Sequence, residues 1–287
     1  MTEAVVLVVG SLHYDIIVES TTLPRRDETA TGSRWYPKFG GKGGNQAVAA
    51  QKGGAAVRMC GAVGPDDFGR FLRDTLRASG VDDRFVATVA GVGSGMSVAI
   101  MDAAGDYAAT IVSGANLRIP AEALQDEALW QGVGLLVLQN EVAEPINVQA
   151  AGQARVRGIP TLLNAAPYRP MAPEFCRLVD ILVVNAVEAE MIGAGPVQSL
   201  GNAAAAARQL SSRFATGVVT AGALGLAAWT GPYNILSIPA QRVKAVSSHG
   251  AGDAFIGTLA THLVRGHGFA AACQAASTAA ARHVAGL

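Results

Sequence analysis

The sequence is poor in cysteine, in aromatic residues and in charge, and these shortages exclude several classes of protein. Only 3 of its 287 residues are cysteine, and Cys60, Cys176 and Cys273 lie far apart with no CxxC pair. That pattern argues against a disulfide scaffold and suits a reducing cytoplasm. Charged residues make up 15% of the chain, and 22 basic side chains balance 22 acidic ones. Because the net charge is zero, no general field attracts a polyphosphate backbone, and we expect no nucleic acid partner.

Long hydrophobic runs are also missing. No segment reaches the roughly 18 consecutive apolar residues of a membrane helix, so we expect no membrane partner. Met1-Thr2-Glu3 lacks the basic lead of a signal peptide, and the apolar run that follows stops at Gly10. We therefore expect a cytoplasmic protein. Hydrophobic residues make up 50% of the chain, which excludes a disordered chain and is enough for a large core.

Short apolar segments alternate with helical ones along most of the chain, and this alternation predicts the fold class. It is typical of a mostly parallel sheet covered by helices on both faces, a three-layer α/β/α fold. The expected strands are 5–9, 57–61, 134–138, 161–163, 181–184, 217–220, 226–230, 235–238 and 243–246. The expected helices are 45–51, 68–79, 121–129, 145–157, 188–192, 203–214 and two more that reach the end of the chain.

Two half-polar stretches, 14–39 and 93–116, break this rhythm. Their strands alternate apolar and polar residues, and 96–101 and 107–112 flank a turn at 104–106. We expect them to form a small separate β-sheet. This sheet would be inserted in one domain that spans residues 1–287.

Several common functional motifs are absent. Gly41-Lys42 is followed by Gly43 rather than Ser or Thr, so the chain has no GxxxxGK[ST] phosphate loop. The first strand ends in Gly10-Ser11-Leu12-His13, which is not the GxGxxG dinucleotide fingerprint. Neither HExxH nor GxSxG occurs, and the five histidines show no metal-ligand spacing.

A glycine-rich stretch, Gly250-Ala251-Gly252-Asp253-Ala254-Phe255, opens the first of the two last helices. Its uncovered backbone N–H groups and the positive end of the helix would form an anion cradle. Asp253 then has two interpretations. It is either an N-terminal cap of that helix or a carboxylate that accepts a hydroxyl proton beside the anion.

A second stretch, Phe39-Gly40-Gly41-Lys42-Gly43-Gly44-Asn45-Gln46, opens an earlier helix. It is either a flexible turn with Asn45 as the helix cap or a backbone that approaches a small polar ligand. In the second case Lys42 and Asn45 would face the hydroxyl groups of that ligand.

Together the two stretches resemble the signatures of the ribokinase-like (PfkB) carbohydrate kinase family, and within it those of the ribokinases. GGKGxNQAVAA matches residues 40–50 and GAGDxFxG matches residues 250–257. Five shorter pieces follow the family order between them: 113–116, 139–141, 163–167, 185–188 and 220–222. Each piece alone is weak, whereas seven in order make a specific resemblance over nearly the whole chain.

The resemblance implies an ATP-dependent kinase with a small β-sheet lid and assigns roles to individual residues. Asp253 resembles the base that takes the hydroxyl proton, and the amides of Gly250, Ala251 and Gly252 resemble the anion hole. The sugar-binding positions of the family fall at His13, Asp15, Gly40, Gly41, Lys42, Asn45, Glu141 and Asp253. The nucleotide-binding positions fall at Asn185, Thr220, Gly222, Gly225, Gly252 and Gln274, and Glu188 resembles the residue that supports Mg²⁺ through water.

For some of these positions a purely structural role is an open alternative. Asp15 follows a short strand and could be a turn residue, Glu188 could cap its short helix, and Asn164 has no assigned role. The lid strands suit a homodimer and a monomer equally.

Four departures from the family pattern bear on substrate and cofactors. His13 stands where ribokinases have a sugar-contacting Asn, and Tyr14 where they have a small residue, so the pair could narrow the pocket or stack on a ring. Ser247 replaces the Asp that helps to hold a monovalent cation, and the sequence ends at Leu287, before the segment that completes the cation loop. We therefore expect weak or absent K⁺ activation. Ala186 replaces an acid of the NxTE motif, but Glu188 remains, so we expect Mg²⁺ use to survive.

The sequence thus predicts transfer of the γ-phosphoryl group of ATP to a primary hydroxyl of a small sugar. Ribose is the first candidate acceptor, and a nucleoside, pseudouridine-type nucleosides included, is the second. The alternative from a different class is a catalytically silent protein that binds sugar or nucleotide on the same fold.

Overall fold

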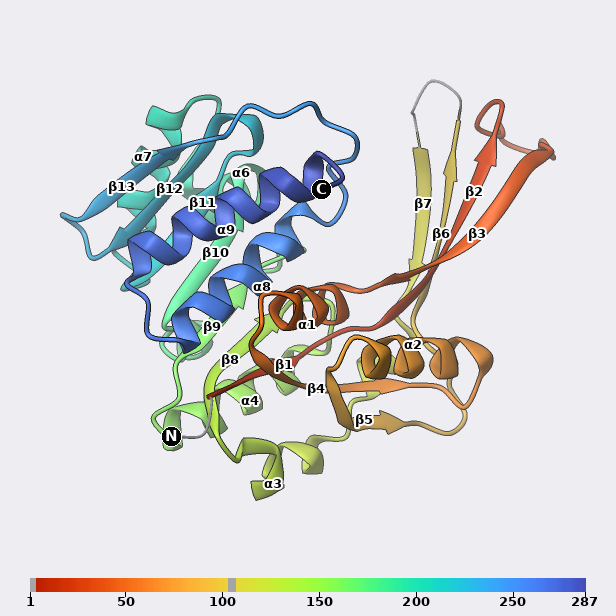
Figure 1. Cartoon of the computed structure of the whole chain (residues 1–287), viewed down its shortest axis with the longest axis horizontal. Coiled ribbons are helices and arrows are strands. Elements are labelled where there is room, and N and C mark those ends of the chain that lie inside the picture. The colour runs from red at the N-terminus through yellow and green to blue at the C-terminus, as the bar shows by residue number, and fades with distance from the viewer. Residues whose placement is uncertain (1–3, 103–106) are drawn as a thin grey trace.

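The main sheet of the protein has nine strands, and its order explains why the functional residues come together. The computed structural model describes residues 4–102 and 107–287 (Figure 1). The strands run in the order β13-β12-β11-β10-β9-β8-β1-β4-β5, and of these described strands β12 alone is reversed, since it pairs antiparallel with both β11 and β13. Their bounds are β1 (Val5–Val9), β4 (Ala56–Val63), β5 (Asp82–Thr88), β8 (Val133–Gln139), β9 (Thr161–Asn164), β10 (Ile181–Asn185), β11 (Thr216–Thr220), β12 (Gly225–Thr230) and β13 (Ile235–Pro239).

Helices cover both faces of this sheet, which confirms the three-layer α/β/α prediction. The alternation along β1 shows the two cores: Val6 and Val8 pack into one hydrophobic cluster, and Leu7 and Val9 into the other. The first cluster includes α1 (Lys42–Lys52), α2 (Asp67–Ala78), α8 (Ala251–Val264) and α9 (Phe269–Val284). The second includes α3 (Glu127–Trp130), α4 (Glu144–Val156), α5 (Pro173–Cys176), α6 (Ala186–Ala189) and α7 (Leu200–Leu210).

The small separate sheet expected from the two half-polar stretches is also present. Its four strands run in the order β3-β2-β6-β7, and Figure 1 shows them projecting away from the layered core. They are β2 (His13–Ser20), β3 (Gly32–Gly40), β6 (Met96–Met101) and β7 (Tyr107–Val112). The turn expected at 104–106 lies outside the described residues.

The structure corrects several local expectations. Residues 243–246 form no strand: they are exposed, and the backbone of Val246 donates to Val284 O at the end of α9. The helix expected at 121–129 is divided because Asp126 caps a new short helix by accepting from Ala128 N. Strand β5 was not expected, since its sequence DDRFVAT carries almost no apolar alternation.

Helix α1 also begins earlier than expected, at Lys42, with Gly41 as its N-cap. Asn45 therefore lies inside the helix, and its interpretation as the cap was wrong. Asp253 is likewise not a cap, because Gly250 occupies that position of α8 with φ 83°. Both polar side chains are thus left without a capping role.

Among the described residues, no helix is long and apolar enough to cross a membrane.

Candidate active site

The carboxyl ends of five adjacent parallel strands bring the predicted residues to one edge of the main sheet. Strands β1, β8, β9, β10 and β11 are parallel, so each delivers the residue after its last apolar position to that edge. Ligands of open α/β sheets bind in this place because helix N-termini and loops meet there. A pocket of about 110 Å³ opens at this edge and is lined by Lys42, Asn164, Asn185, Glu188, Thr220, Gly250, Gly252 and Asp253, among others.

Asp253 is the most closely held carboxylate of the site. It lies in the first turn of α8, buried, and both of its oxygens accept hydrogen bonds from side-chain amides of α1. Asn45 Nδ2 donates to Oδ2 at 3.1 Å, and Gln46 Nε2 donates to Oδ1 at 2.9 Å. Burial raises the pKa of Asp253 above its ordinary value of 3.8, while Lys42 and the two amides lower it.

Glu141 is the second carboxylate, and it follows β8 on the same edge. Its Oε2 accepts from Ser11 Oγ at 2.5 Å and from Lys42 N at 2.9 Å. His13 Nδ1 lies 3.9 Å from the same oxygen, and its buried Nε2 has no hydrogen-bond partner among the described residues. The segment after β1 and the start of α1 therefore fix this carboxylate together.

Asp15 is the third carboxylate and comes from the small sheet. Ser97 Oγ of the neighbouring strand β6 donates to Asp15 Oδ1 at 2.5 Å. Burial raises the pKa of Asp15 above 3.8, and nearby His13, His249 and Lys38 lower it. A cavity of about 460 Å³ lies beside these groups, and its lining includes Lys38, Asn45, His249, Gly250 and Asp253.

The glycines of residues 40–44 are explained mainly by close packing against the chain itself. A Cβ on Gly40 would lie 2.0 Å from Asp15 Oδ2, and one on Gly43 would lie 2.6 Å from Ser11 N. Gly41 has φ 85°, a backbone conformation that favours glycine, and a Cβ there would lie 2.7 Å from His13 N. The sequence pattern suggested a backbone that approaches a ligand, whereas here it approaches residues 10–15 and so brings Lys42 and Asn45 to the site.

The N-terminus of α8 fits the expected anion cradle. Gly250 and Gly252 line the 110 Å³ pocket, and the 14-residue helix directs its positive end there. Of the three amides expected to act together, Ala251 N donates to Ser248 O in a long bond of 3.3 Å.

Asn185 and Glu188, which line the same pocket, form a capping box. Glu188 N donates to Asn185 Oδ1, and Asn185 N donates to Glu188 Oε2, both at 2.9 Å. The capping interpretation of Glu188 is thus correct, yet the residue also lines the pocket. Burial raises the pKa of Glu188 above its ordinary value of 4.5. A nearby cation would lower that pKa again.

The remaining predicted nucleotide residues are more dispersed. Thr220 ends β11 inside the pocket, and Gly222 opens the loop that follows. Gly225 has a packing reason to be glycine, since a Cβ there would lie 2.1 Å from Ile238 O. Gln274 lies in a groove between α8 and α9, with Thr258 and His262, and does not line the pocket of Asn185 and Thr220.

Comparison with known proteins identifies the family of the chain. The pattern of the pfkB family of carbohydrate kinases matches residues 3–285. The chain belongs to the pfkB family. It is 33% identical to a ribokinase of Bacillus subtilis (strain 168), covering 97% of this chain and 92% of the relative, and 33% identical to a deoxyribokinase of Salmonella typhi, covering 98% and 92%. The structure of Arabidopsis thaliana ribokinase complexed with ribose and ATP superposes with a TM-score of 0.90 at 26% identity, covering 99% of this chain and 93% of that one.

This PfkB kinase is therefore a phosphotransferase with an alcohol group as acceptor. Three polar residues of the site were not expected to take part in it. Ser11 and Gln46 belong to segments that the sequence analysis discussed, but the sequence does not reveal their partners. Glu141 lies 130 residues from Ser11, and Asp253 lies 207 residues from Gln46. Ser97 carried no signal at all, because it meets Asp15 only through the register of β2 on β6.

Few side chains that could bind a metal ion come together at this site. Among residues 4–102 and 107–287, no group of three or more His, Cys, Asp or Glu side chains could hold a metal ion by itself. The oxygens of Glu188 and Asn185 suit a hard cation that keeps most of its water. The residues present therefore fit Mg²⁺ that is bound chiefly through water and phosphate oxygens.

Proposed function

We propose that this chain transfers the γ-phosphoryl group of ATP to a primary hydroxyl of a small sugar, with ribose as the first candidate. One observation carries the proposal. A buried carboxylate, Asp253, is held by two side-chain amides at the positive end of a 14-residue helix. A proton acceptor beside an anion cradle is what phosphoryl transfer to an alcohol requires.

The reaction follows from this geometry. The acceptor hydroxyl gives its proton to Asp253 while its oxygen forms a bond to the γ-phosphorus of ATP. The bond from that phosphorus to the β-phosphate oxygen breaks, and ADP leaves. The N-terminus of α8 and Lys42, which lines the same pocket, stabilise the charge on the transferred group.

The acceptor would lie between the small sheet and the core. His13 and Asp15 contribute from β2 of the small sheet, and Glu141 and Asn45 contribute from the core side. Carboxylates and amides suit a polyol because each forms hydrogen bonds to hydroxyl groups, and an analogue that lacks a hydroxyl leaves them unpaired. We propose that the small sheet, formed by residues 14–39 and 93–116 in a single domain, acts as a lid that keeps water from the phosphoryl group.

We also propose that Glu188 supports Mg²⁺ through water, and that Asn185, Thr220 and Gly222 contact the nucleotide. Bound Mg²⁺ would neutralise charge on the phosphate oxygens of ATP. Gly225 and Gln274 receive weaker support, for the packing and placement reasons given above.

The monovalent cation of the family is expected to matter little here. Ser247 lies in an exposed loop, and its backbone N–H donates to Val284 O. Because the residue is a serine, this position has no negative charge to offer a cation. A neutral hydroxyl is a poor replacement for a carboxylate at a hard-cation site. We propose that K⁺ activates this enzyme weakly or not at all.

The structure weakens the argument for a nucleoside acceptor. Tyr14 does not face the carboxylates, because its ring stacks on Phe68 of α2 at 4.1 Å and meets Phe71 edge-on at 4.9 Å. One face of the Tyr14 ring is therefore covered by Phe68, which makes the ring less available to stack on a base. The names of the two relatives favour ribose and deoxyribose instead.

The test is ATP consumption with Mg²⁺ against a panel of ribose, deoxyribose, other pentoses, hexoses and nucleosides, run beside the Asp253→Asn variant. We expect turnover with a pentose and a loss of at least about a thousandfold in kcat for the variant, since it removes the proton acceptor. Circular dichroism and thermal unfolding of the variant serve as the folding control.

Three other results would change the proposal. Near-wild-type turnover of Asp253→Asn would remove Asp253 from its role. A sugar-induced rise in melting temperature without ATP turnover would favour the silent binding protein. A several-fold stimulation by K⁺ over a large organic cation, at matched ionic strength, would contradict the cation proposal.

A further inference from the structure

The side chain of Gln46 has no assigned role, yet it lies at the centre of the site. It belongs to α1, is 1% exposed, and its Nε2 donates two hydrogen bonds. One goes to Asp253 Oδ1 at 2.9 Å and the other to Asn164 Oδ1 at 3.1 Å. The two acceptors lie 207 and 118 residues from Gln46 in the sequence, so only the fold brings them to one amide.

The orientation of this amide is dictated by a chain of partners that starts at a backbone carbonyl. Asn164 Nδ2 donates to Val183 O at 3.4 Å, and a carbonyl oxygen can only accept. Asn164 must therefore turn its oxygen towards Gln46. That oxygen also accepts only, so Gln46 turns its nitrogen to Asn164 and presents the same nitrogen to Asp253.

The opposite end of the amide shows that this orientation carries a cost. Gln46 Oε1 is buried and has no hydrogen-bond partner among the described residues. A buried, unpaired carbonyl oxygen is unfavourable. The contacts of the nitrogen with Asp253 and Asn164 offset that cost.

We propose that Gln46, fixed by Asn164, is a positioning residue that keeps Asp253 ionised and ready to accept the hydroxyl proton. The inference rests on the proposed function, in which Asp253 is the base. The ionised carboxylate accepts from Gln46 on one oxygen and from Asn45 on the other. A protonated carboxyl group would have to place its hydrogen against an N–H group, which disfavours that form.

The charged groups around Asp253 have opposing effects on its ionisation, so an uncharged donor matters. Lys42 of α1 favours the ionised carboxylate, whereas Glu141 after β8 and burial of the group disfavour it. His249, in the loop before α8, also faces Asp253, and burial lowers its pKa, so it adds little positive charge near neutral pH. Gln46 is an uncharged donor whose contribution does not vary with pH.

The experiment is the pH dependence of kcat/KM for the acceptor at saturating ATP in Gln46→Met, which keeps the length of the side chain and removes its donor. Asp253 acts when ionised, so the rate falls as pH drops through its pKa. Losing one hydrogen bond to the carboxylate should move this acid limb upward by about 1 pH unit, while activity at high pH stays largely intact.

Asn164→Leu and the double variant test the fixed orientation. Asn164→Leu keeps Gln46 but leaves its amide free to rotate. The acid limb of the kcat/KM profile of this variant should therefore move to higher pH, by part of the shift seen in Gln46→Met. The double variant should shift no further than Gln46→Met alone, since Asn164 acts through Gln46. If Gln46→Met does not fold, the upward shift in Asn164→Leu alone decides the question.

A matched control is Thr261→Val, which removes another buried hydrogen bond between α8 and α1, from Thr261 Oγ1 to Ala50 O at 2.9 Å. It should leave the pH profile unchanged. Titration of the Asp253 carboxyl carbon by ¹³C NMR, assigned with Asp253→Asn, gives the same shift without turnover.

The inference is overturned if Gln46→Met lowers kcat/KM equally at every pH, or if the Asp253 titration does not move. Both results leave the proposed function standing as long as Asp253→Asn is inactive. An active Asp253→Asn variant would instead remove the proposed function itself.

Discussion

Three carboxylates of the site, Glu141, Asp15 and Asp253, are each held by a different set of donors. A hydroxyl and a backbone amide hold Glu141, a hydroxyl holds Asp15, and two side-chain amides hold Asp253. Fixed donors keep a carboxylate in one rotamer before the substrate arrives, which reduces the ordering cost of binding. The residues that hold these carboxylates should therefore affect acceptor binding and pH dependence more than folding.

Ser11→Ala should raise KM for the acceptor by about tenfold. A hydrogen bond to a charged group is lost, and Glu141 then keeps only the bond from Lys42 N of the two described above. KM for ATP should stay near the wild-type value, since among the described residues the Ser11 hydroxyl forms hydrogen bonds with Glu141 and Gly43 N and with no nucleotide-binding candidate. Steady-state kinetics with each substrate varied in turn measures both values.

Ser199→Ala is the matched control. Ser199 caps α7 by accepting a hydrogen bond from Asn202 N, and it lies more than 50 residues in the sequence from each of the three carboxylates. It should cost about 1 kcal/mol in unfolding free energy and leave both KM values unchanged. An unchanged acceptor KM in Ser11→Ala would show that the position of Glu141 does not matter for binding.

The sequence could predict Asp253, Lys42, Asn45 and Glu141 as candidates because each follows a strand or opens a glycine-rich helix. It could not predict their pairing. Ser11 and Gln46 make their contacts across more than 100 residues. Ser97 reaches Asp15 only through the register of the parallel pair β2 and β6, which no hairpin turn fixes.

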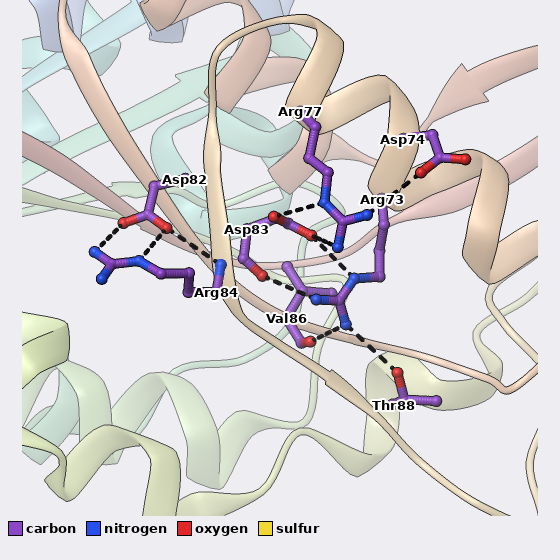
Figure 2. A network of polar contacts seen from close by, with 8 residues as sticks. All are labelled: Arg73, Asp74, Arg77, Asp82, Asp83, Arg84, Val86 and Thr88. Carbon is purple, nitrogen blue, oxygen red and sulfur yellow. Dashed lines mark hydrogen bonds and ion pairs between the residues drawn. The ribbon is translucent and has the colours of Figure 1, made fainter.

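At the scale of elements, α2 is fastened to the edge strand β5 by arginines rather than by an apolar face alone. Figure 2 shows Arg73 and Arg77 of α2 converging on Asp83. Arg73 Nε lies 2.9 Å from Asp83 Oδ2, and its Nη1 donates to Val86 O at 2.8 Å. Asp83 is buried, so these bonds are only weakly screened by solvent.

Asp83→Asn should lower the free energy of unfolding by about 2 kcal/mol, because it leaves Arg73 and the half-exposed Arg77 facing a buried neutral amide. Urea unfolding at neutral pH measures this loss, and KM for both substrates should not change. Asp74→Asn removes a different, exposed partner of Arg77 and should cost at most about 0.5 kcal/mol. Equal effects of the two variants would contradict the argument.

The same edge explains where element prediction from sequence succeeded and failed. Buried parallel strands such as β1 are continuous apolar runs, and they were predicted closely. Strand β5 is stabilised by ion pairs between Asp83 and the arginines of α2. A prediction from hydrophobic periodicity treats such charged residues as part of a loop, so it missed this strand. The valines of 243–246 look like a strand, but this segment lies exposed in a loop.

At the scale of the whole molecule, the site is divided between the small sheet and the layered core. Asp15 belongs to β2, and Glu141, Asn45 and Asp253 belong to loops and helices of the core. Tyr14, the neighbour of Asp15, packs its ring on α2 and so ties the base of the small sheet to the core. An acceptor bound to both parts would bridge them.

A bridging acceptor should stabilise the whole chain, and Asp15 should be needed for it. At an acceptor concentration of about 100 times Kd, binding adds roughly 2.7 kcal/mol to the unfolding free energy, which thermal unfolding reports as a higher Tm. Asp15→Ala should lose most of that rise at the same concentration.

Without acceptor, however, Asp15→Ala should be as stable as the wild type or more so. Burial raises the pKa of Asp15, and an acid with a raised pKa destabilises the fold at any pH where it is ionised. Glu19→Ala is the matched control, because Glu19 lies four residues further along β2 on the same face of the sheet and pairs with the exposed Arg34. It should keep the full acceptor-induced rise in Tm. If Asp15→Ala also kept it, the acceptor would bind to the core alone, and the small sheet would not close over it as a lid.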